Sequence, residues 1–588
     1  MITRVAKASP SDAVLRQAIA NHQAGHLAEA EKLYRQVLAF RPQFAEVHVN
    51  LAAVLMLQGK LVEGEAASRQ GIAFKPDYAQ AHYRLGDILA FQGRLDEAAR
   101  SYRQALALKR DYAEAHNNLG NVLLQQGMVE DAEAAYRRAI AARPGFAEAY
   151  NNLGNLFMQQ SLPDEAIVSY RRALEIRPDF SEAHNNIGYI LLQTEKLDEA
   201  VLSFRRALTT KPEYAEALSN LGAALGKQDK LVEAEAFCLR AIAARPNYAE
   251  AHNNLGNVLK MQGKLVEAEA SYRKAIAVKP NYAEAYKQLG CVLCEENRIE
   301  EGFLALTHHA ELCYGPGKPL RAGPVVPHKI QHDREQYAYL SGTEASEGEI
   351  ILESLRLVDG SRVTGPAVNL KNTIVEIEDK WRHKRPQIVV IDNLLTDEAL
   401  GKLRRFCWGS TIWRMIYEGG YLGATPEHGF ACPLLAQIAE ELRTTYPAIF
   451  GGHPLLHSWA FKYDSRLSGI KLHADFAAVN VNFWITPDEA NLDPQSGGLV
   501  VWDAAAPLDW DFMKYNTAEK EIRDFLAREG ATPVTIPYRA NRAVIFDSDL
   551  FHETDKIAFK EGYLNRRINV TLLYGSRERD GNAARIAD

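Results

Sequence analysis

Apolar positions follow two different periods along the chain. Over roughly the first 316 residues they recur at helical spacing, as in LVEAEASYRKAIAVKP at 265–280, and this pattern predicts successive amphipathic helices. After about residue 386 short segments alternate apolar and polar residues, which predicts β-strands. The predicted strands are 456–464, 479–485, 497–503, 542–548 and 567–575. Short strands separated by turn signals favour a β-sandwich or a small barrel.

The helical half is an array of 34-residue repeats. Three segments nearly superimpose: AEAHNNLGNVLLQQG from Ala113, AEAYNNLGNLFMQQS from Ala147 and AEAHNNLGNVLKMQG from Ala249. The residue before the Leu-Gly step recurs every 34 positions, at 50, 84, 118, 152, 186, 220, 254 and 288. A proline keeps the same phase at 42, 76, 144, 178, 212, 246 and 280, with Arg110 in the missing slot. A fixed period of this length indicates a stack of similar units.

Each repeat is predicted to contain two amphipathic helices, which we call helix A and helix B. Helix A carries the Leu-Gly step, and the small glycine in its middle lets helix B approach closely. The proline after helix B closes the unit, because proline cannot continue a helix. The turn between the two helices often contains glycine, as at Gly59, Gly93, Gly127 and Gly263.

This pattern resembles the tetratricopeptide repeat (TPR). The resemblance covers residues 11 to about 316, as eight full repeats and a degenerate ninth. It implies a right-handed superhelix whose concave groove holds a protein or peptide partner. The alternative is an array that serves only as a passive scaffold.

An asparagine stands before the Leu-Gly step in six of the eight repeats. Asparagine is a poor helix former, so helix propensity does not explain the choice. A primary amide both donates and accepts hydrogen bonds, and a row of amides in the groove would pair with the backbone of an extended peptide. The arrangement resembles the peptide-binding repeats of the O-linked N-acetylglucosamine transferases. The alternative, that these side chains cap or bridge neighbouring helices, stays open. The residues are Asn50, Asn118, Asn152, Asn186, Asn220 and Asn254, with Arg84 and Gln288 in the other two repeats.

The periodic pattern ends after Cys313 in a segment rich in proline and glycine, YGPGKPLRAGPVVPHKIQHD, which is typical of a linker. We therefore expect an α + β multidomain protein. Its parts are a TPR solenoid at 1–316, a linker or capping segment at 317–385, and a β-sandwich or small barrel with flanking helices at 386–588. An acidic, helix-like insertion at 503–537 interrupts the predicted strands.

Three residues of metal-binding types follow one another in the barrel region in an order that indicates a metal site. His473 and Asp475 are separated by one residue, so on a strand their side chains project from the same face. His552 is the only histidine after Asp475 and directly follows a predicted strand. Two imidazoles and one carboxylate form the facial set that suits non-haem Fe(II) in oxygenases.

Residues 386 to about 576 resemble the prolyl-4-hydroxylase branch of the Fe(II)/2-oxoglutarate dioxygenases. This resemblance implies that 386–588 folds as a double-stranded β-helix (jelly-roll) barrel with flanking helices. In that resemblance His473, Asp475 and His552 match the iron ligands. The sequence Ser-Gly-Gly at 496–498 matches the start of the next barrel strand. Tyr463 matches a tyrosine near the cosubstrate.

The resemblance also implies a basic residue on the last strand that binds the distal carboxylate of 2-oxoglutarate. Arg566 and Arg567 are both candidates, and they point to opposite faces of a strand. In Arg567-Ile-Asn-Val-Thr571 the polar residues share the parity of Arg567, whereas the apolar residues share the parity of Arg566 and pack outward. We therefore expect Arg567 to grip the carboxylate with its forked guanidinium, with Thr571 as its helper.

The resemblance implies a hydroxylase that uses Fe(II), 2-oxoglutarate and O2 to oxidise a C–H bond. Collagen-type prolyl hydroxylases and prolyl 3-hydroxylases also join such repeats to such a barrel, which favours a protein or peptide substrate captured by the groove. Two alternatives are an oxygenase of a small molecule that uses the repeats for docking, and a non-enzymatic repeat adaptor with a vestigial barrel.

Composition and charge indicate which partners and which cellular location to expect. The net charge is −7, whereas nucleic-acid binders are usually basic, so we expect no nucleic-acid partner. Six cysteines in 588 residues are too few for a disulfide scaffold. Cys291 and Cys294 lie inside a repeat helix and are expected to be packing residues. The start of the chain shows no signal peptide, and no apolar run is long enough to cross a membrane. We expect a cytoplasmic protein without a membrane partner.

Overall fold

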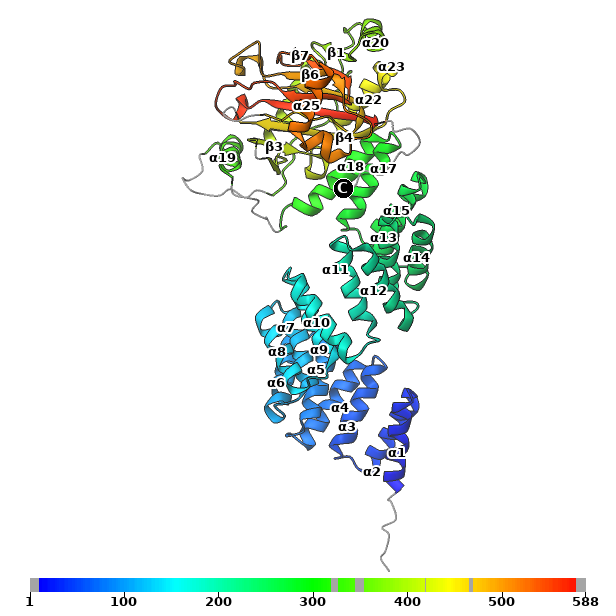
Figure 1. The fold of residues 1–588 in the computed structure, drawn as a ribbon. Helices are drawn as coiled ribbons and strands as arrows, with labels where there is room; N and C mark the ends of the chain where they lie inside the picture. Colours follow the sequence, from blue (N-terminus) through cyan, green and yellow to red (C-terminus); the bar gives the residue numbers. More distant parts are fainter. Residues whose placement is uncertain (1–9, 319–325, 344–353, 418, 465–468, 578–588) are drawn as a thin grey trace, which may run out of the picture. The chain divides into compact units, whose positions relative to one another are not determined.

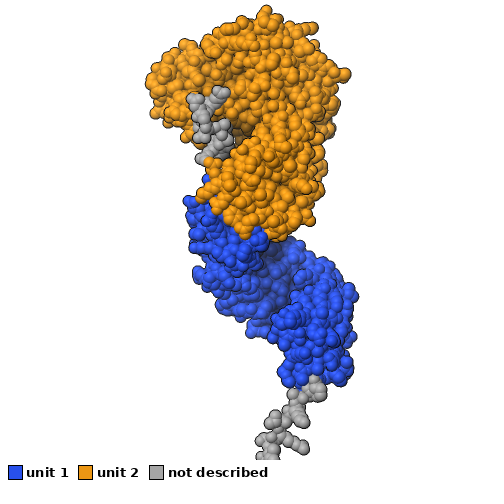
Figure 2. Space-filling view, turned by 90° about the vertical axis from the view of Figure 1, so that its right-hand side faces the viewer, with its two compact units in different colours: residues 1–228 blue, residues 229–588 orange. Residues whose placement is uncertain are grey.

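The computed structural model describes residues 10–318, 326–343, 354–417, 419–464 and 469–577 (Figure 1). The chain divides into two compact units, residues 1–228 and 229–588 (Figure 2). Each unit is described here by itself.

The first unit consists of paired antiparallel helices joined by short turns. The turn between the two helices of a repeat ends in a residue with positive φ, such as Gly93 at +76° and Gly127 at +78°, which glycine adopts without steric cost. The helices are α1 (Pro10–Gln23), α2 (Leu27–Phe40), α3 (Ala45–Leu57), α4 (Leu61–Phe74), α5 (Ala79–Phe91), α6 (Leu95–Leu108), α7 (Ala113–Gln125), α8 (Val129–Ala142), α9 (Ala147–Gln159), α10 (Pro163–Ile176), α11 (Ser181–Gln193), α12 (Leu197–Thr210) and α13 (Ala215–Lys227).

The glycine of helix A has the packing role that the sequence predicts. A Cβ on Gly154 of α9 would lie 2.5 Å from Cε1 of Tyr170 on α10, and one on Gly120 would lie 2.6 Å from Cε1 of Tyr136. Both tyrosines are buried. The aromatic ring of helix B therefore occupies the space that a side chain on helix A would fill, and this contact sets the close approach of the two helices.

The second unit begins with further helices of the same kind and continues into a region rich in strands. The helices are α14 (Leu231–Ala244), α15 (Ala249–Met261), α16 (Leu265–Val278), α17 (Ala283–Glu295) and α18 (Ile299–Tyr314), followed by α19 (Pro327–Ser341), α20 (Ile374–His383), α21 (Asp397–Gly409), α22 (Pro433–Thr445), α23 (Pro447–Phe450), α24 (Phe512–Thr517) and α25 (Glu519–Glu529), with three short 3-10 helices, η1 (Pro426–His428), η2 (Asp488–Ala490) and η3 (Tyr563–Asn565). None of the described helices is long and apolar enough to cross a membrane.

The strands form two antiparallel sheets. The seven-stranded sheet has the order β1-β8-β5-β10-β4-β3-β2, and the three-stranded sheet has the order β7-β6-β9. The strands are β1 (Ile388–Ile391), β2 (Met415–Tyr417), β3 (Tyr421–Ala424), β4 (Leu455–Tyr463), β5 (Ala477–Trp484), β6 (Leu499–Ala505), β7 (Pro533–Ile536), β8 (Ala543–Asp547), β9 (Leu550–Thr554) and β10 (Ile568–Ser576).

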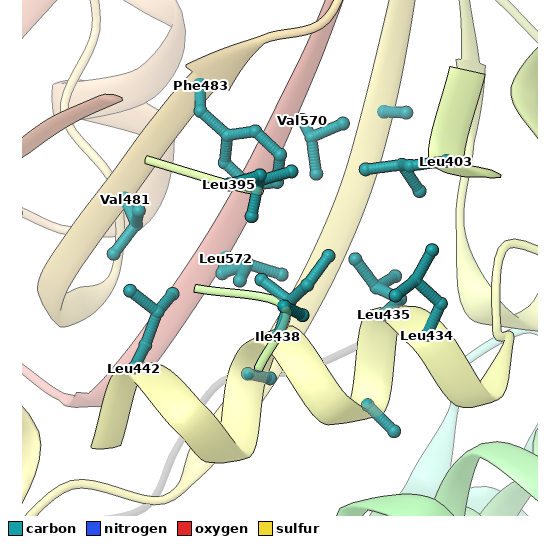
Figure 3. Packing of buried hydrophobic residues seen from close by; sticks show 14 of the residues in the cluster. Leu395, Leu403, Leu434, Leu435, Ile438, Leu442, Val481, Phe483, Val570 and Leu572 are labelled. Carbon is teal, nitrogen blue, oxygen red and sulfur yellow. The ribbon is translucent and has the colours of Figure 1, made fainter. Parts of the chain in front are cut away.

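One face of the seven-stranded sheet packs on helices (Figure 3). Leu434 and Ile438 of α22 pack against Phe483 of β5 and against Val570 and Leu572 of β10. Because side chains alternate along a strand, the residues between these apolar positions face the other side of the sheet. On β5 and β10 those residues include four polar ones, Asn480, Asn482, Asn569 and Thr571, so the second face of the sheet can hold a site.

The apolar core under this helix layer includes residues from all three predicted segments. Phe303 and Leu306 of α18 contribute to it from the repeats, and Val363 and Trp381 contribute from the segment 317–385. Thr307 of α18 also donates a hydrogen bond to the carbonyl of Ala431, 2.9 Å away, just before α22. The last repeat and the strand-rich region therefore share one core, and the described part of 317–385 covers it.

Candidate metal centre

Two neighbouring strand segments bring the two histidines of the predicted triad together. His473 and His552 form an isolated antiparallel bridge, in which each backbone N–H donates to the carbonyl of the other, at 3.0 and 2.7 Å. Their ring centroids are 4.3 Å apart. Asp475 completes the group, with 3.8 Å between its Oδ1 and Nε2 of His473 and 3.4 Å between its Oδ2 and Nε2 of His552. One ligand atom from each residue lies within 4.8 Å of the others.

Backbone carbonyls set the tautomer of both imidazoles. Nδ1 of His473 lies 2.8 Å from the carbonyl oxygen of Lys471, and Nδ1 of His552 lies 3.0 Å from that of Leu550. A carbonyl only accepts hydrogen bonds, so each Nδ1 carries the proton and each Nε2 keeps its lone pair. Both lone pairs are then available in the place where the three side chains meet, as a metal site needs.

The charge states also suit a cation. Burial and the neighbouring His552 lower the pKa of His473 to about 4, so its imidazole is neutral at physiological pH. Burial works to raise the pKa of Asp475, but the neighbouring imidazoles of His552 and His473 and the hydrogen bond from Asn480 outweigh it and lower that pKa. Two imidazoles and one carboxylate are the donor set expected for non-haem Fe(II).

The 503–537 insertion supports the loop that carries two of these residues. The backbone N–H of Ala474, between His473 and Asp475, donates to the carbonyl oxygen of Tyr515 at 3.0 Å. Tyr515 belongs to α24 and packs with Leu472 and Ala474 in a separate apolar cluster. The insertion thus packs against the loop that carries His473 and Asp475, a role that the sequence did not reveal.

Arg567 lies on the same face of the seven-stranded sheet as this polar site, and its guanidinium is buried. Its Nε donates to the carbonyl of Gly497 at 2.7 Å, and its Nη2 donates to that of Gly498 at 3.1 Å. The guanidinium carbon lies 4.6 Å from the ring centroid of Tyr463. Its Nη1 is buried and has no hydrogen-bond partner in the described part of the chain. A buried donor of this kind is costly unless an acceptor reaches it, so a carboxylate fits here.

The Ser-Gly-Gly motif needs glycine for a steric reason. Gly497 has a φ of +81°, and a Cβ on Gly498 would lie 1.9 Å from the carbonyl oxygen of Ile536. Only glycine lets this segment enter β6 at that distance while presenting two carbonyls to Arg567. Arg566 lies on the opposite side, where its Nε donates to Glu335 at 2.8 Å.

Thr571 lies on the Arg567 face of β10 but is engaged with other side chains. Its hydroxyl donates to Oδ1 of Asn482 at 2.9 Å and accepts from Nδ2 of Asn569 at 3.1 Å. Asn482 in turn contacts Asn480, which donates to Asp475. We did not single out these asparagines from the sequence, although the alternation in VNVNFW at 479–484 already places both β5 amides on one face.

The asparagines of the first unit bridge neighbouring repeats. Nδ2 of Asn152 donates to Oδ1 of Asn117 at 3.0 Å and to Oδ1 of Asn121 at 3.2 Å, both on the preceding helix A. The same pattern joins Asn186 to Asn151 and Asn155. Bridging between repeats therefore accounts for the hydrogen bonds that the NH2 groups of Asn152 and Asn186 donate. Asn118 and Asn220 also donate to side chains of the preceding helix A.

The row of amides is interrupted at α5, where Asn118 meets an acidic residue. Asn118 donates to Oδ1 of Asp87 at 3.0 Å, and Tyr102 donates to the same oxygen at 2.8 Å. Arg84, which replaces asparagine on α5, pairs with the other oxygen of Asp87 at 2.9 Å. Burial raises the pKa of Asp87 in spite of these partners.

Cys294 of the last repeat is buried, whereas Cys291 is partly exposed. A Cβ on Gly302 would lie 2.6 Å from Sγ of Cys294, so the thiol fills the helix contact. Within the described residues the only group of three or more metal-ligating side chains with suitable geometry is His473, Asp475 and His552.

Four family models match the helical half of the chain. A model described as TPR repeat matches residues 86–127, and models described as tetratricopeptide repeat match 22–88, 117–249 in three overlapping copies, and 249–282. Residues 22–282 are tetratricopeptide repeats. No curated protein matches the chain.

Several solved structures resemble part of the chain. The Cut9–Hcn1 hetero-tetramer of APC/C is 19% identical over 50% of this chain and 57% of that one, with a TM-score of 0.40. YrrB, described as a TPR protein with an unusual peptide-binding site, is 24% identical over 32% of this chain and 96% of that one, with a TM-score of 0.27. PilF of Pseudomonas aeruginosa is 18% identical over 37% of this chain and 97% of that one, with a TM-score of 0.34. This chain thus spans little more than half the length of Cut9.

Proposed function

We propose that residues 386–588 form an Fe(II)/2-oxoglutarate-dependent dioxygenase that hydroxylates a C–H bond on a protein or peptide held by the TPR groove. The observation that carries the proposal is the convergence of His473, Asp475 and His552, with Nε2 of both imidazoles free to bind a cation. TPR arrays commonly serve as protein-interaction scaffolds, and this supports a protein or peptide as the substrate.

The strand order supports a jelly-roll barrel. The strands β8, β5, β10 and β4 lie side by side in this order in the larger sheet, so no two neighbours among them are consecutive in the chain, and β7, β6 and β9 lie in the smaller sheet. The bridge of His473 to β9 adds a further segment beside the smaller sheet. From β4 to β10 the chain thus passes repeatedly between the two sheets, with β6 and β7 consecutive in the smaller one, and this order is consistent with a jelly roll.

The residues present fit both the metal and its cosubstrate. His473, Asp475 and His552 would hold Fe(II), and Nη1 of Arg567 would donate to the distal carboxylate of 2-oxoglutarate. Burial lowers the pKa of Arg567, so an anion beside it would stabilise its charged form. The bound iron and 2-oxoglutarate would supply the O2-dependent chemistry that oxidises an unactivated C–H bond. The protein's own residues orient these groups, and the buried inner face of the sheet excludes bulk water.

The groove supports peptide capture through amide oxygens. Asn152 and Asn186 use their NH2 groups to bridge repeats, and their Oδ1 atoms accept no hydrogen bond from the described residues. An oxygen fixed in this way can accept a backbone N–H of an extended peptide whatever its side chains are.

The first test is a visible spectrum of the full chain after anaerobic addition of Fe(II) and 2-oxoglutarate. A metal-to-ligand charge-transfer band in the wild type that is lost in Asp475→Ala supports the cosubstrate site. No band, with the protein folded and iron present, would favour the vestigial-barrel adaptor. If the band is present, 2-oxoglutarate turnover stimulated only by small metabolites would favour the small-molecule alternative. Oxygen addition to a captured polypeptide, detected by mass spectrometry, would support the peptide substrate.

A further inference from the structure

A chain of buried side-chain amides runs from Asp475 along the inner face of the seven-stranded sheet. Asn480 donates from Nδ2 to Oδ2 of Asp475, and Asn482 donates from Nδ2 to Oδ1 of Asn480 at 2.5 Å. At the far end Oδ1 of Asn482 accepts from Nδ2 of Asn569 at 2.7 Å and from the hydroxyl of Thr571 at 2.9 Å. We call Asn480, Asn482, Asn569 and Thr571 the amide relay.

The direction of the relay follows from the carboxylate. An ionised carboxylate only accepts hydrogen bonds, so Asn480 must turn its NH2 group toward Asp475 and its oxygen toward Asn482. The same logic turns the NH2 group of Asn482 toward Asn480 and its oxygen toward β10. Each amide is therefore fixed by its neighbour, and bonds that point the same way strengthen one another in a buried setting.

Strand register explains why these residues meet. Asn482 of β5 lies opposite Thr571 of β10, and Asn480 lies opposite Leu573. Asn480 is 0% exposed and Asn482 is 4% exposed. Asparagine is disfavoured in strands, and a buried amide is tolerated only when its hydrogen bonds are made. An apolar pair would serve the sheet equally well, so packing alone does not account for two amides that end on a candidate metal ligand.

We propose that the amide relay is a positioning device for Asp475. Asn480 occupies Oδ2 and so fixes the rotation of the carboxylate, which leaves Oδ1 without a hydrogen bond from any described residue and available to a cation. The relay ends on β10, the strand that directly follows Arg567. It therefore connects Asp475 to the strand beside the residue proposed to bind the cosubstrate. The relay residues are positioning residues, and this inference rests on the proposed function.

The test measures metal binding alone, with Mn2+ as the probe and the free-ion EPR signal as the readout, on the full apo chain without cosubstrate. Loss of a hydrogen bond to a ligating side chain typically weakens metal binding 10–100-fold, and we expect this for Asn480→Ala. Asn482→Ala should weaken binding about 3–10-fold, because it acts through Asn480. The double variant should bind no more weakly than Asn480→Ala, since residues in one network are not additive.

Asn541→Ala is the matched control. Asn541 is also buried and makes two hydrogen bonds, both with the backbone of Leu395, so its loss should lower stability without changing Mn2+ affinity. Thr571→Val keeps the side-chain volume and removes only the hydroxyl, and it should fold and bind Mn2+ about 2–3-fold more weakly.

The outcomes separate the inference from the proposed function. Wild-type Mn2+ affinity in Asn480→Ala and Thr571→Val, with loss in Asp475→Ala, would overturn the relay and leave the metal site standing. Additive losses in Asn480→Ala and Asn482→Ala would also overturn it. A wild-type chain that binds no Mn2+, or binds it equally well as Asp475→Ala, would overturn the proposed function itself.

Discussion

Nε of Arg567 donates a hydrogen bond to the carbonyl oxygen of Gly497 at 2.7 Å, and this bond ties the segment before the last strand to the start of β6. A second bond runs from Nη2 to the carbonyl oxygen of Gly498. Nε and Nη2 are therefore both engaged, whereas Nη1 is buried and has no hydrogen-bond partner among the described residues. The orientation of the arginine is therefore set by the backbone before any ligand binds, which lowers the entropic cost of holding a carboxylate.

Arg567→Lys should weaken 2-oxoglutarate binding by about 10–100-fold, because an ammonium cannot keep both carbonyl contacts and also donate to the carboxylate. Titration of the charge-transfer band with 2-oxoglutarate at saturating Fe(II) measures the change. Mn2+ binding without cosubstrate should stay as in the wild type. Arg566→Lys is the control, since its partner is Glu335 on the other side. Equal 2-oxoglutarate affinity in both variants would contradict this role for Arg567.

Gly154→Ala should destabilise the repeats by about 1–3 kcal/mol, as is typical when an extra methyl enters a packed core. Its Cβ would lie 2.5 Å from the ring of Tyr170, whereas a Cβ on Gly145 would meet no atom within 4 Å. Urea unfolding followed by circular dichroism measures both variants. Gly145→Ala, the control, should be neutral or slightly stabilising. A loss of the same size in the two variants would show that the ring contact is not the cause.

The double substitution Asn152→Ala with Asn186→Ala should abolish capture of a polypeptide partner and also lower stability, because it removes both the amide oxygens and the bridges between repeats. Asn117→Ala separates the two effects. Asn117 is 6% exposed and accepts from Asn152, so its loss weakens a bridge but leaves the Asn152 oxygen in the groove. Crosslinking to the captured polypeptide measures binding. If Asn117→Ala and the double variant lose capture alike, the amides act only as bridges.

His428 should make the second unit less stable in acid. Burial, and then the charge of Arg414, lower the pKa of His428 to about 4, against about 6.5 in an unfolded chain. Between these values the unfolded state binds more protons, so the free energy of unfolding falls as pH drops from 6.5 to 4 and levels off below. The shift corresponds to about 3 kcal/mol over this window.

His428→Gln should flatten this dependence, because glutamine does not titrate and can still contact the Thr425 hydroxyl, which lies 2.7 Å from Nδ1 of His428. Urea unfolding of the wild type and the variant at pH 7, 6, 5 and 4 gives the free energy of unfolding at each pH. The difference between the two proteins reports on His428, because the other histidines contribute equally to both. Parallel curves would mean that His428 titrates alike in the folded and unfolded states.

The sequence alone determined much of the fold, because periodicity reports which positions are buried. The 34-residue period predicted the helix pairs, and the Leu-Gly step predicted the close approach that the ring of Tyr170 occupies beside Gly154. Alternation along the last strand placed Arg567 on the face opposite the apolar core. The order of His473, Asp475 and His552 singled out the residues that the fold brings together.

Tertiary structure decided what each polar side chain contacts. Periodicity shows that Asn152 faces a particular side of its helix, but its partner lies 35 residues away on the preceding helix A. The partners of Arg567 lie 69 and 70 residues away, and the amides of β5 meet Thr571 only through strand register. Hydrogen bonds depend on distances of a few ångströms between elements, and these distances are fixed when the elements pack and not by the local pattern of the sequence.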